Sequence, residues 1–200
     1  MEVPISAAGP HVYQLLTGSI CPRPIAWVST VDQAGRTNLA PFSFFNVASV
    51  NPVVLAFAPQ TDGQGNDKDT LLNLHEVGEC VVNICDERLA AAMNQTAATL
   101  DRGHDEFGFA GLEKASMEGV RVPRVKQAPF AYGCQLHDIV SFGSHPGAGQ
   151  LVLARVISVY ADDTLWDGHH VDLAAFQAIG RTVGGGYVRA TDRFDLQRPA

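Results

Sequence analysis

The sequence predicts a mainly β, α+β fold: a closed or partly closed antiparallel barrel with helices in the connections. The chain carries about six runs rich in β-branched and aromatic residues, separated by Gly, Asn, Asp and Pro turn signals. Helical patterns do not alternate regularly with these runs, as they would in a parallel sheet. The length of 200 residues, without an internal repeat or linker, fits a single domain over residues 1–200.

The first expected element is a β-hairpin. Residues 24–31 are β-rich, residues 32–36 carry turn chemistry, and residues 37–45 resume the apolar pattern. Gly35 lies within the turn, where its lack of a Cβ permits a positive φ. The short apolar run 53–58 predicts a further strand, buried on both faces.

A helix is expected next, because Leu71 and Leu74 fall at helical spacing. Asp69 or Thr70 is placed to cap its start, and Gly78 is placed to end it. The run CVVNI that follows predicts another strand.

Asp86 is placed to cap a second helix over residues 87–97. Residues 100–113 show no sustained period and predict an irregular excursion. Two long β-branched strands then follow over residues 130–142 and 150–162, joined by the loop GSHPGAG.

The charge balance restricts the class of partner. A net charge of −7 and a pI near 5.4 argue against nucleic-acid and anionic-membrane partners, which need clustered Lys and Arg. No apolar run approaches the roughly 18 residues of a membrane-spanning helix, and the N-terminus lacks the pattern of a signal peptide. We therefore expect a cytoplasmic protein whose four scattered cysteines are free thiols.

Several catalytic motifs are absent from the sequence. GQGNDK lacks the third glycine of a dinucleotide fingerprint, and there is no phosphate-binding P-loop, no H-E-x-x-H and no G-x-S-x-G. His169 and His170 with Asp172 are interpreted as a solvated turn, so no metal site is expected. His145, in the loop GSHPGAG, is equally compatible with a plain surface position and with a rim that meets a ligand.

Small polar donors concentrate in three segments: residues 26–30, 40–46 and 66–70. Together they suit a phosphorylated, planar and mostly apolar ligand, with Lys68 and a helix N-terminus near Thr70 attracting the phosphate. The alternative, which the pattern alone favours, is that these are ordinary strand and capping residues.

An ordered set of motifs favours the ligand site over the alternative of ordinary strand and capping residues. RPIAWVST, a glycine-containing turn, NLAPFSFFN, an apolar strand after Asn-Pro, KDTLLN, CVVN, and a late GR with GGGY follow one another between about Leu15 and Tyr187. In this order they resemble the flavin reductase-like, FMN-binding split-barrel family. The resemblance implies a six-stranded antiparallel split barrel of Greek-key type, and a homodimer with FMN near the subunit interface.

The resemblance also places the cofactor. It implies that the first hairpin and the KDT segment hold the flavin, with Ser29, Thr30, Lys68 and Thr70 at the phosphate and ribityl chain, and Ser43 and Asn46 at the ring edge. Trp27 either walls the flavin or, as we expect, fills the core. Matched to the family's motifs, the cofactor-binding candidates are Arg23, Ala26, Trp27, Val28, Ser29, Thr30, Ser43, Phe44, Asn46, Lys68, Asp69, Thr70 and Arg181.

The implied activity is that of an NAD(P)H-dependent flavin reductase, which passes electrons to free flavin, oxygen or a partner monooxygenase. The flavin carries the chemistry, so no catalytic side chain is expected, and neutral donors around the ring suffice. Two alternatives remain open: an FMN-binding electron carrier that another protein reduces, and a barrel that binds some other ligand.

Overall fold

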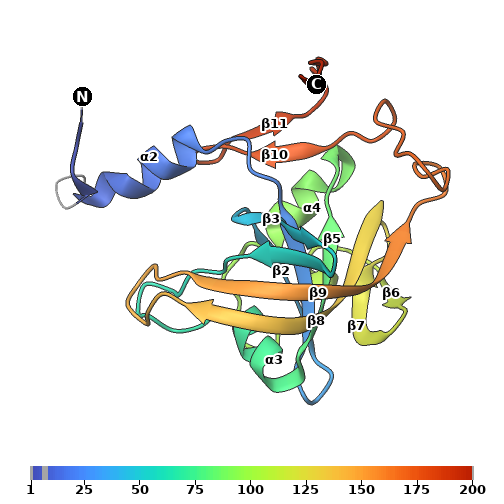
Figure 1. The fold of residues 1–200 in the computed structure, drawn as a ribbon. Helices are drawn as coiled ribbons and strands as arrows, with labels where there is room; N and C mark the ends of the chain where they lie inside the picture. Colours follow the sequence, from blue (N-terminus) through green and yellow to red (C-terminus); the bar gives the residue numbers. More distant parts are fainter. Residues whose placement is uncertain (1, 6–8, 200) are drawn as a thin grey trace.

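The computed structural model describes residues 2–5 and 9–199. Its main element is a seven-stranded antiparallel sheet in the order β2-β1-β5-β8-β9-β4-β3, accompanied by the two-stranded sheets β6-β7 and β10-β11 (Figure 1). The strands are β1 (Ala26–Val31), β2 (Thr37–Phe42), β3 (Phe45–Val50), β4 (Val53–Phe57), β5 (Glu79–Ile84), β6 (Lys114–Met117), β7 (Val120–Val125), β8 (Phe130–Ser141), β9 (Gln150–Ala161), β10 (Ile179–Arg181) and β11 (Tyr187–Arg189).

The helical elements are short; η1 and α2 precede the first strand, and the others lie in the connections, as expected. They are η1 (Gly9–His11), α2 (Val12–Ser19), α3 (Asp69–Val77), η2 (Glu87–Leu89), α4 (Ala90–Gln95) and α5 (Glu106–Phe109). Among the described residues, none of these helices is both long enough and apolar enough to cross a membrane.

The expectation of a six-stranded barrel is corrected to a seven-stranded sheet that is not closed. Its edge strands β2 and β3 follow one another in the chain and are separated only by Ser43 and Phe44. The sheet must therefore curl until its two edges approach each other at this corner, but no ladder joins them. The backbone carbonyl of Phe44 instead accepts a hydrogen bond of 2.8 Å from the N–H of Ala58, at the end of β4.

The first hairpin is confirmed. β1 and β2 pair from Ala26 opposite Phe42 to Val31 opposite Thr37, and Gly35 adopts a φ of 81° in the turn. All six residues of β1 are buried, because the strand is covered on both faces. Ala26 and Val28 pack against α3 inside the curled sheet, while Trp27 packs outside it against α4 and α5.

Helix α3 packs inside the curled sheet. Leu71 and Leu74 are fully buried in the same cluster as strands β1, β4, β5, β8 and β9. Gly78 ends the helix in the left-handed conformation, as expected. The expected cap is wrong: Lys68 occupies the N-cap position and no side chain caps the helix, so the first-turn N–H groups keep no side-chain partner there.

Helix α2 was not expected from the sequence. It projects beyond the main sheet, beside the β10-β11 hairpin (Figure 1), and only Thr17 is buried. Tyr13, Leu15 and Leu16 of the helix are exposed, as is Ile20 directly after it. The helix therefore gains little from burial within this chain.

Candidate functional site

Three adjoining cavities form a groove along the end of β2, and Pro41 lines all three. We call the cavity of about 280 Å³ between the N-terminus of α3 and residues 96–100 the polar lobe. The aromatic lobe, about 330 Å³, is lined by Tyr13, Phe42, Ser43, Phe44, Gln60, Thr61 and Lys68, among others. The arginine lobe, about 190 Å³, is lined by Tyr13, Ser43, Asn94, Arg181 and Tyr187, among others.

The polar lobe presents a helix N-terminus and a cation. Lys68 is exposed, precedes the first turn of α3, and lines both the polar and the aromatic lobes. The N–H of Leu71 donates to the carbonyl of Lys68 at 2.8 Å, but no side chain caps α3, so the N–H groups of Asp69 and Thr70 and the helix dipole remain available to an anion. The side chains of Asp69 and Thr70 belong to the same wall.

Acidic side chains also line the polar lobe, and three of the four are engaged with other groups. Asp62 accepts hydrogen bonds of 2.8 Å from the backbone N–H groups of Gln64 and Asn66, and these bonds lower its pKa. Buried Glu106 accepts one of 3.0 Å from the N–H of Leu39, and burial raises the pKa of Glu106. The carboxyl groups of Asp62 and Glu106 are thus held by backbone N–H groups of the protein itself.

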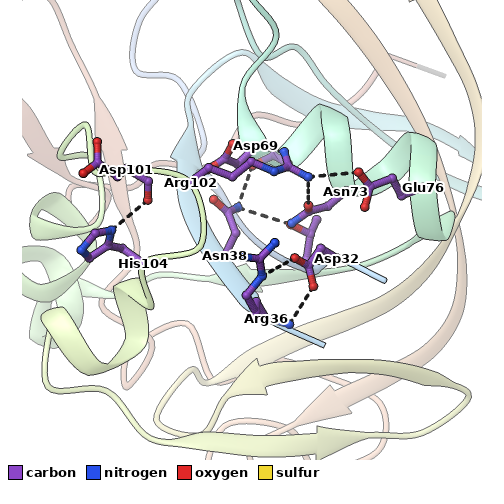
Figure 2. Close-up of polar contacts among 11 residues, drawn as sticks. Asp32, Arg36, Asn38, Asp69, Asn73, Glu76, Asp101, Arg102 and His104 are labelled. Carbon is purple, nitrogen blue, oxygen red and sulfur yellow. Dashed lines mark hydrogen bonds and ion pairs between the residues drawn. The ribbon is translucent and has the colours of Figure 1, made fainter. Parts of the chain in front are cut away.

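A polar network holds the start of α3 in place (Figure 2). The Nδ2 of Asn38 donates to Thr70 Oγ1 at 3.0 Å and to Thr30 Oγ1 at 3.3 Å, and Asn73 donates to Thr30 at 3.0 Å. On the outer side, Arg102 forms ion pairs with Asp69 at 3.3 Å and with Glu76 at 3.1 Å. Arg102 thereby links the chain that follows residues 96–100 to the helix, so it joins the two walls of the polar lobe.

Replacing Arg102 with methionine should raise the dissociation constant of a phosphorylated ligand in the polar lobe about fivefold, since two partly exposed ion pairs are together worth about 1 kcal/mol. A fluorescence titration with FMN measures this. Arg121→Met is the matched control, because Arg121 pairs with Glu79 and lines none of the three lobes. Equal affinities in the two variants would show that Arg102 does not shape the lobe.

The side chains of the candidate residues on β1 do not line the groove. Ala26, Trp27 and Val28 have no exposed area, and the indole Nε1 of Trp27 donates to Thr96 Oγ1 at 2.9 Å. Core filling is therefore the role that the structure gives Trp27, as expected. Ala26 and Val28 form part of the core between β1 and α3.

The hydroxyls of Ser29 and Thr30 are used inside the protein. Ser29 is fully buried and donates to the carbonyl of Pro123 at 2.7 Å. Thr30 is fully buried in the network below α3. Both hydroxyls thus support the α3 wall and the sheet, and their direct contact with a phosphate or ribityl chain stays a prediction from the resemblance. Asn46 is exposed on β3, lines none of the three lobes, and accepts from the N–H of Val47.

Of the other candidates, Ser43 lines the aromatic and arginine lobes, and Phe44 lines the aromatic lobe. Arg23 is buried behind them and donates to Ser43 Oγ at 3.3 Å. Arg181 lines the arginine lobe, a different part of the groove from Lys68.

A family model described as flavin reductase like domain matches residues 17–173. The chain belongs to the flavin reductase-like family. Its backbone agrees with a solved family structure, nitrilotriacetate monooxygenase component B from Bacillus cereus, with a TM-score of 0.93, 33% identity and 98% coverage of each chain.

Two further relatives extend the comparison within the family. The 2-nitrobenzoate 2-nitroreductase NbaA of Pseudomonas fluorescens is 32% identical, with a TM-score of 0.89 and coverage of 100% of this chain and 96% of the other. An uncharacterized protein of Deinococcus radiodurans is 39% identical over 194 residues, which cover 93% of this chain and 84% of the relative.

Several residues that line the groove were not among the candidates predicted from the sequence. Residues 96–100 form a wall of the polar lobe, and Tyr13, Gln60 and Thr61 line the aromatic lobe. The small polar run NQTAAT was a usable signal for the first of these, because short polar residues after a helix commonly make ligand-binding loops. No local sequence pattern indicates Tyr13, because helix α2 lies far in the sequence from the other residues of the aromatic lobe.

Among the residues described, no three His, Cys, Asp or Glu side chains gather as a metal site would require. His169 and His170 lie in an exposed turn, where their backbone N–H groups donate to Asp167. The carbonyl of His145 accepts a hydrogen bond of 2.7 Å from Thr61, a residue of the aromatic lobe. The loop that carries His145 therefore supports one wall of the groove.

Proposed function

We propose that the groove binds FMN, with the phosphate in the polar lobe and the ring between the aromatic side chains beyond Pro41. The observation that carries this is the uncapped N-terminus of α3 beside Lys68, in a cavity that adjoins an aromatic one. The donor set fits the group: an ammonium, free helix N–H groups and hydroxyls for the phosphorylated tail, and Phe42 and Phe44 for an apolar ring.

The proposed activity is that of an NAD(P)H-dependent flavin reductase. The chemistry that bound FMN would supply is acceptance of a hydride from the nicotinamide and transfer of the electrons to an acceptor. The chain's own residues bind, orient and shield: Lys68 and the first turn of α3 hold the tail, and the rings of Phe42 and Phe44 exclude water. Ser43, hydrogen-bonded to Arg23, supplies a fixed polar group in the aromatic lobe.

Anaerobic mixing of the FMN-loaded protein with NADH or NADPH tests this activity. We expect loss of the oxidised-flavin absorbance near about 450 nm, because the cofactor itself receives the electrons. A protein that binds FMN but is bleached by neither nucleotide is an electron carrier that another protein reduces. A protein that binds no FMN refutes both readings and leaves a barrel for some other ligand.

The comparisons support two classes of electron acceptor. One relative is named as a component of a nitrilotriacetate monooxygenase, which supports delivery of reduced flavin to a partner oxygenase. Another is named as a 2-nitrobenzoate 2-nitroreductase, and the aromatic lobe supports a second candidate, direct reduction of a nitroarene. Product formation from 2-nitrobenzoate under anaerobic conditions, without an added oxygenase, distinguishes the second candidate from the first.

We propose a homodimer. Helix α2 exposes Tyr13 (56%) and Leu15 (59%), and Ile20 (60%) is exposed directly after it. Tyr13 also lines the groove. Exposed apolar groups on one projecting helix commonly mark an interface, and a second copy seated there would complete the groove wall. Sedimentation equilibrium should give twice the chain mass of 21.4 kDa, and a monomer at micromolar concentration would contradict the proposal.

We place the protein in the cytoplasm. Cys80 and Cys134 lie opposite each other on β5 and β8, both buried, and neither forms a disulfide. Burial raises the pKa of Cys85 to about 12, so this thiol stays protonated and unreactive. Free thiols of this kind persist in a reducing compartment. Recovery of the protein in a secreted fraction of its own cells would contradict this location.

A further inference from the structure

Two arginines lie side by side at one end of the groove, and they are bonded differently. The N–H of Arg23 donates to the carbonyl of Arg181 at 2.9 Å, and the N–H of Arg181 donates back at 2.8 Å. The guanidinium of Arg23 is buried and donates to the carbonyls of Thr17 (2.7 Å), Ile20 (3.0 Å) and Thr182 (3.0 Å), and to Ser43. Arg23 therefore acts as a structural link between helix α2 and the β10 strand.

The guanidinium of Arg181, unlike that of Arg23, has few hydrogen-bond partners in the protein. Its Nη2 donates to the carbonyl of Gly184, and its guanidinium lies over the ring of Tyr187, 4.6 Å from the centroid. Within residues 2–5 and 9–199, its other N–H groups make no hydrogen bond or ion pair. An arginine carries five donors in a planar fork, and stacking on an aromatic ring fixes the plane of that fork. The guanidinium of Arg181 is therefore a cation of fixed orientation with N–H donors available to a ligand.

The surroundings of Arg181 favour an oxyanion. No carboxylate lines the arginine lobe, whereas Asn94, Ser43 and two tyrosines do. The nearby acid Glu87 is already held by Arg189, with contacts of 2.6 to 2.8 Å. The ring of Tyr187 is itself held by a hydrogen bond of 3.2 Å from its hydroxyl to Asn94 Oδ1. An incoming oxyanion would meet a positive group and no opposing charge from the lobe itself.

The groove therefore has a cation in each of two separate lobes, Lys68 in the polar lobe and Arg181 in the arginine lobe. FMN carries a single phosphate, and the proposed function assigns it to Lys68 and α3. Arg181, the second cation, is therefore available to a ligand other than the FMN phosphate.

We infer that the arginine lobe binds an oxyanion, phosphate or carboxylate, of the second substrate, and that Arg181 pairs with it while Tyr187 and Asn94 hold Arg181 in place. This inference rests on the proposed function. The oxyanion has two chemical sources: the phosphates of a dihydronicotinamide nucleotide, or the carboxylate of an aromatic acceptor. In either case Arg181 sets which substrates are held, and it takes no part in electron transfer.

The test compares charged and uncharged substrates in the FMN-loaded protein. The donor arm measures anaerobic flavin reduction by NADH, NADPH and the phosphate-free donor N-benzyl-1,4-dihydronicotinamide. The acceptor arm measures reoxidation of the reduced protein by 2-nitrobenzoate and by nitrobenzene. Each is measured in wild type, Arg181→Gln, Arg181→Lys and the control Arg189→Gln, which removes an equal charge from the same hairpin but lines none of the three lobes.

In Arg181→Gln we expect the half-saturating concentration of the anionic substrate in one arm to rise about tenfold or more, as for loss of a charge-assisted pair. Its uncharged counterpart and the dissociation constant of FMN should stay within about twofold, since neither uses this cation. Arg181→Lys should restore part of the loss. The arm that responds identifies the source of the oxyanion.

Three results would overturn the inference while leaving the proposed function intact: equal losses for charged and uncharged substrates, no change in either arm, or weakened FMN binding with unchanged anionic substrates. The last would assign Arg181 to the flavin phosphate. Failure of the wild-type protein to bind FMN, or to be reduced by any of the three donors, would instead refute the proposed reductase, and the inference with it.

Discussion

Replacing Trp27 with alanine should lower the free energy of unfolding by about 3 to 5 kcal/mol, the usual loss for a large aromatic side chain in a core. Trp27 has no exposed area, packs in the cluster with Leu39, Met93 and Phe107, and donates its indole N–H to Thr96. The substitution leaves a cavity that the neighbouring strands cannot fill. Urea denaturation followed by circular dichroism measures the loss.

Trp27→Phe separates packing from the hydrogen bond. It keeps most of the buried volume but removes the donor to Thr96 Oγ1, which still donates to the carbonyl of Met93 at 2.7 Å. We expect a smaller loss, of about 1 to 3 kcal/mol. If Trp27→Ala keeps the wild-type stability but abolishes FMN binding, the indole is a wall of the flavin site and its assignment to the core is wrong.

Replacing Lys68 with methionine should weaken FMN binding by about 1 to 3 kcal/mol, roughly fivefold to 150-fold, because a charge-assisted contact to the phosphate is lost. Lys68 lies at the N-cap of α3 and lines the polar lobe. Methionine keeps a similar length and apolar stem. Fluorescence titrations with FMN and with riboflavin measure the two affinities.

Riboflavin is the internal control for this prediction, since it lacks the phosphate and its affinity should be unchanged. Lys126→Met is the protein control, because Lys126 is exposed, pairs with Glu113 and lines none of the three lobes. If the Lys68 variant loses FMN and riboflavin equally, or loses neither, the phosphate is bound elsewhere.

Much of the strand pattern could be predicted from local chemistry. The β1-β2 hairpin follows from a turn that needs the positive φ of Gly35, and β8 and β9 from long β-branched runs. The strand count could not be predicted, because β3 continues the apolar pattern of β2 through Ser43 and Phe44 without Gly or Pro. The short strands β6, β10 and β11 bury few residues, so their sequences carry little alternation.

Some features of the candidate site could likewise be predicted from the sequence, and others could not. Lys68 and Thr70 could be placed from sequence, because helix starts and anion sites share a local pattern. The burial of Ser29 and Thr30 could not, because it depends on elements far along the chain that cover both faces of β1, including Pro123 and Asn73. An alternating strand does not reveal whether its polar face meets solvent or a second layer.

The most direct test of the central claim, that the start of α3 and the adjoining aromatic lobe hold a flavin, is a crystal structure of the protein grown with FMN. We predict the phosphate within hydrogen-bond distance of Lys68 and the first turn of α3, with the ring beyond Pro41. Flavin bound outside the three lobes, or a groove that stays free of flavin at saturating FMN, would contradict the account.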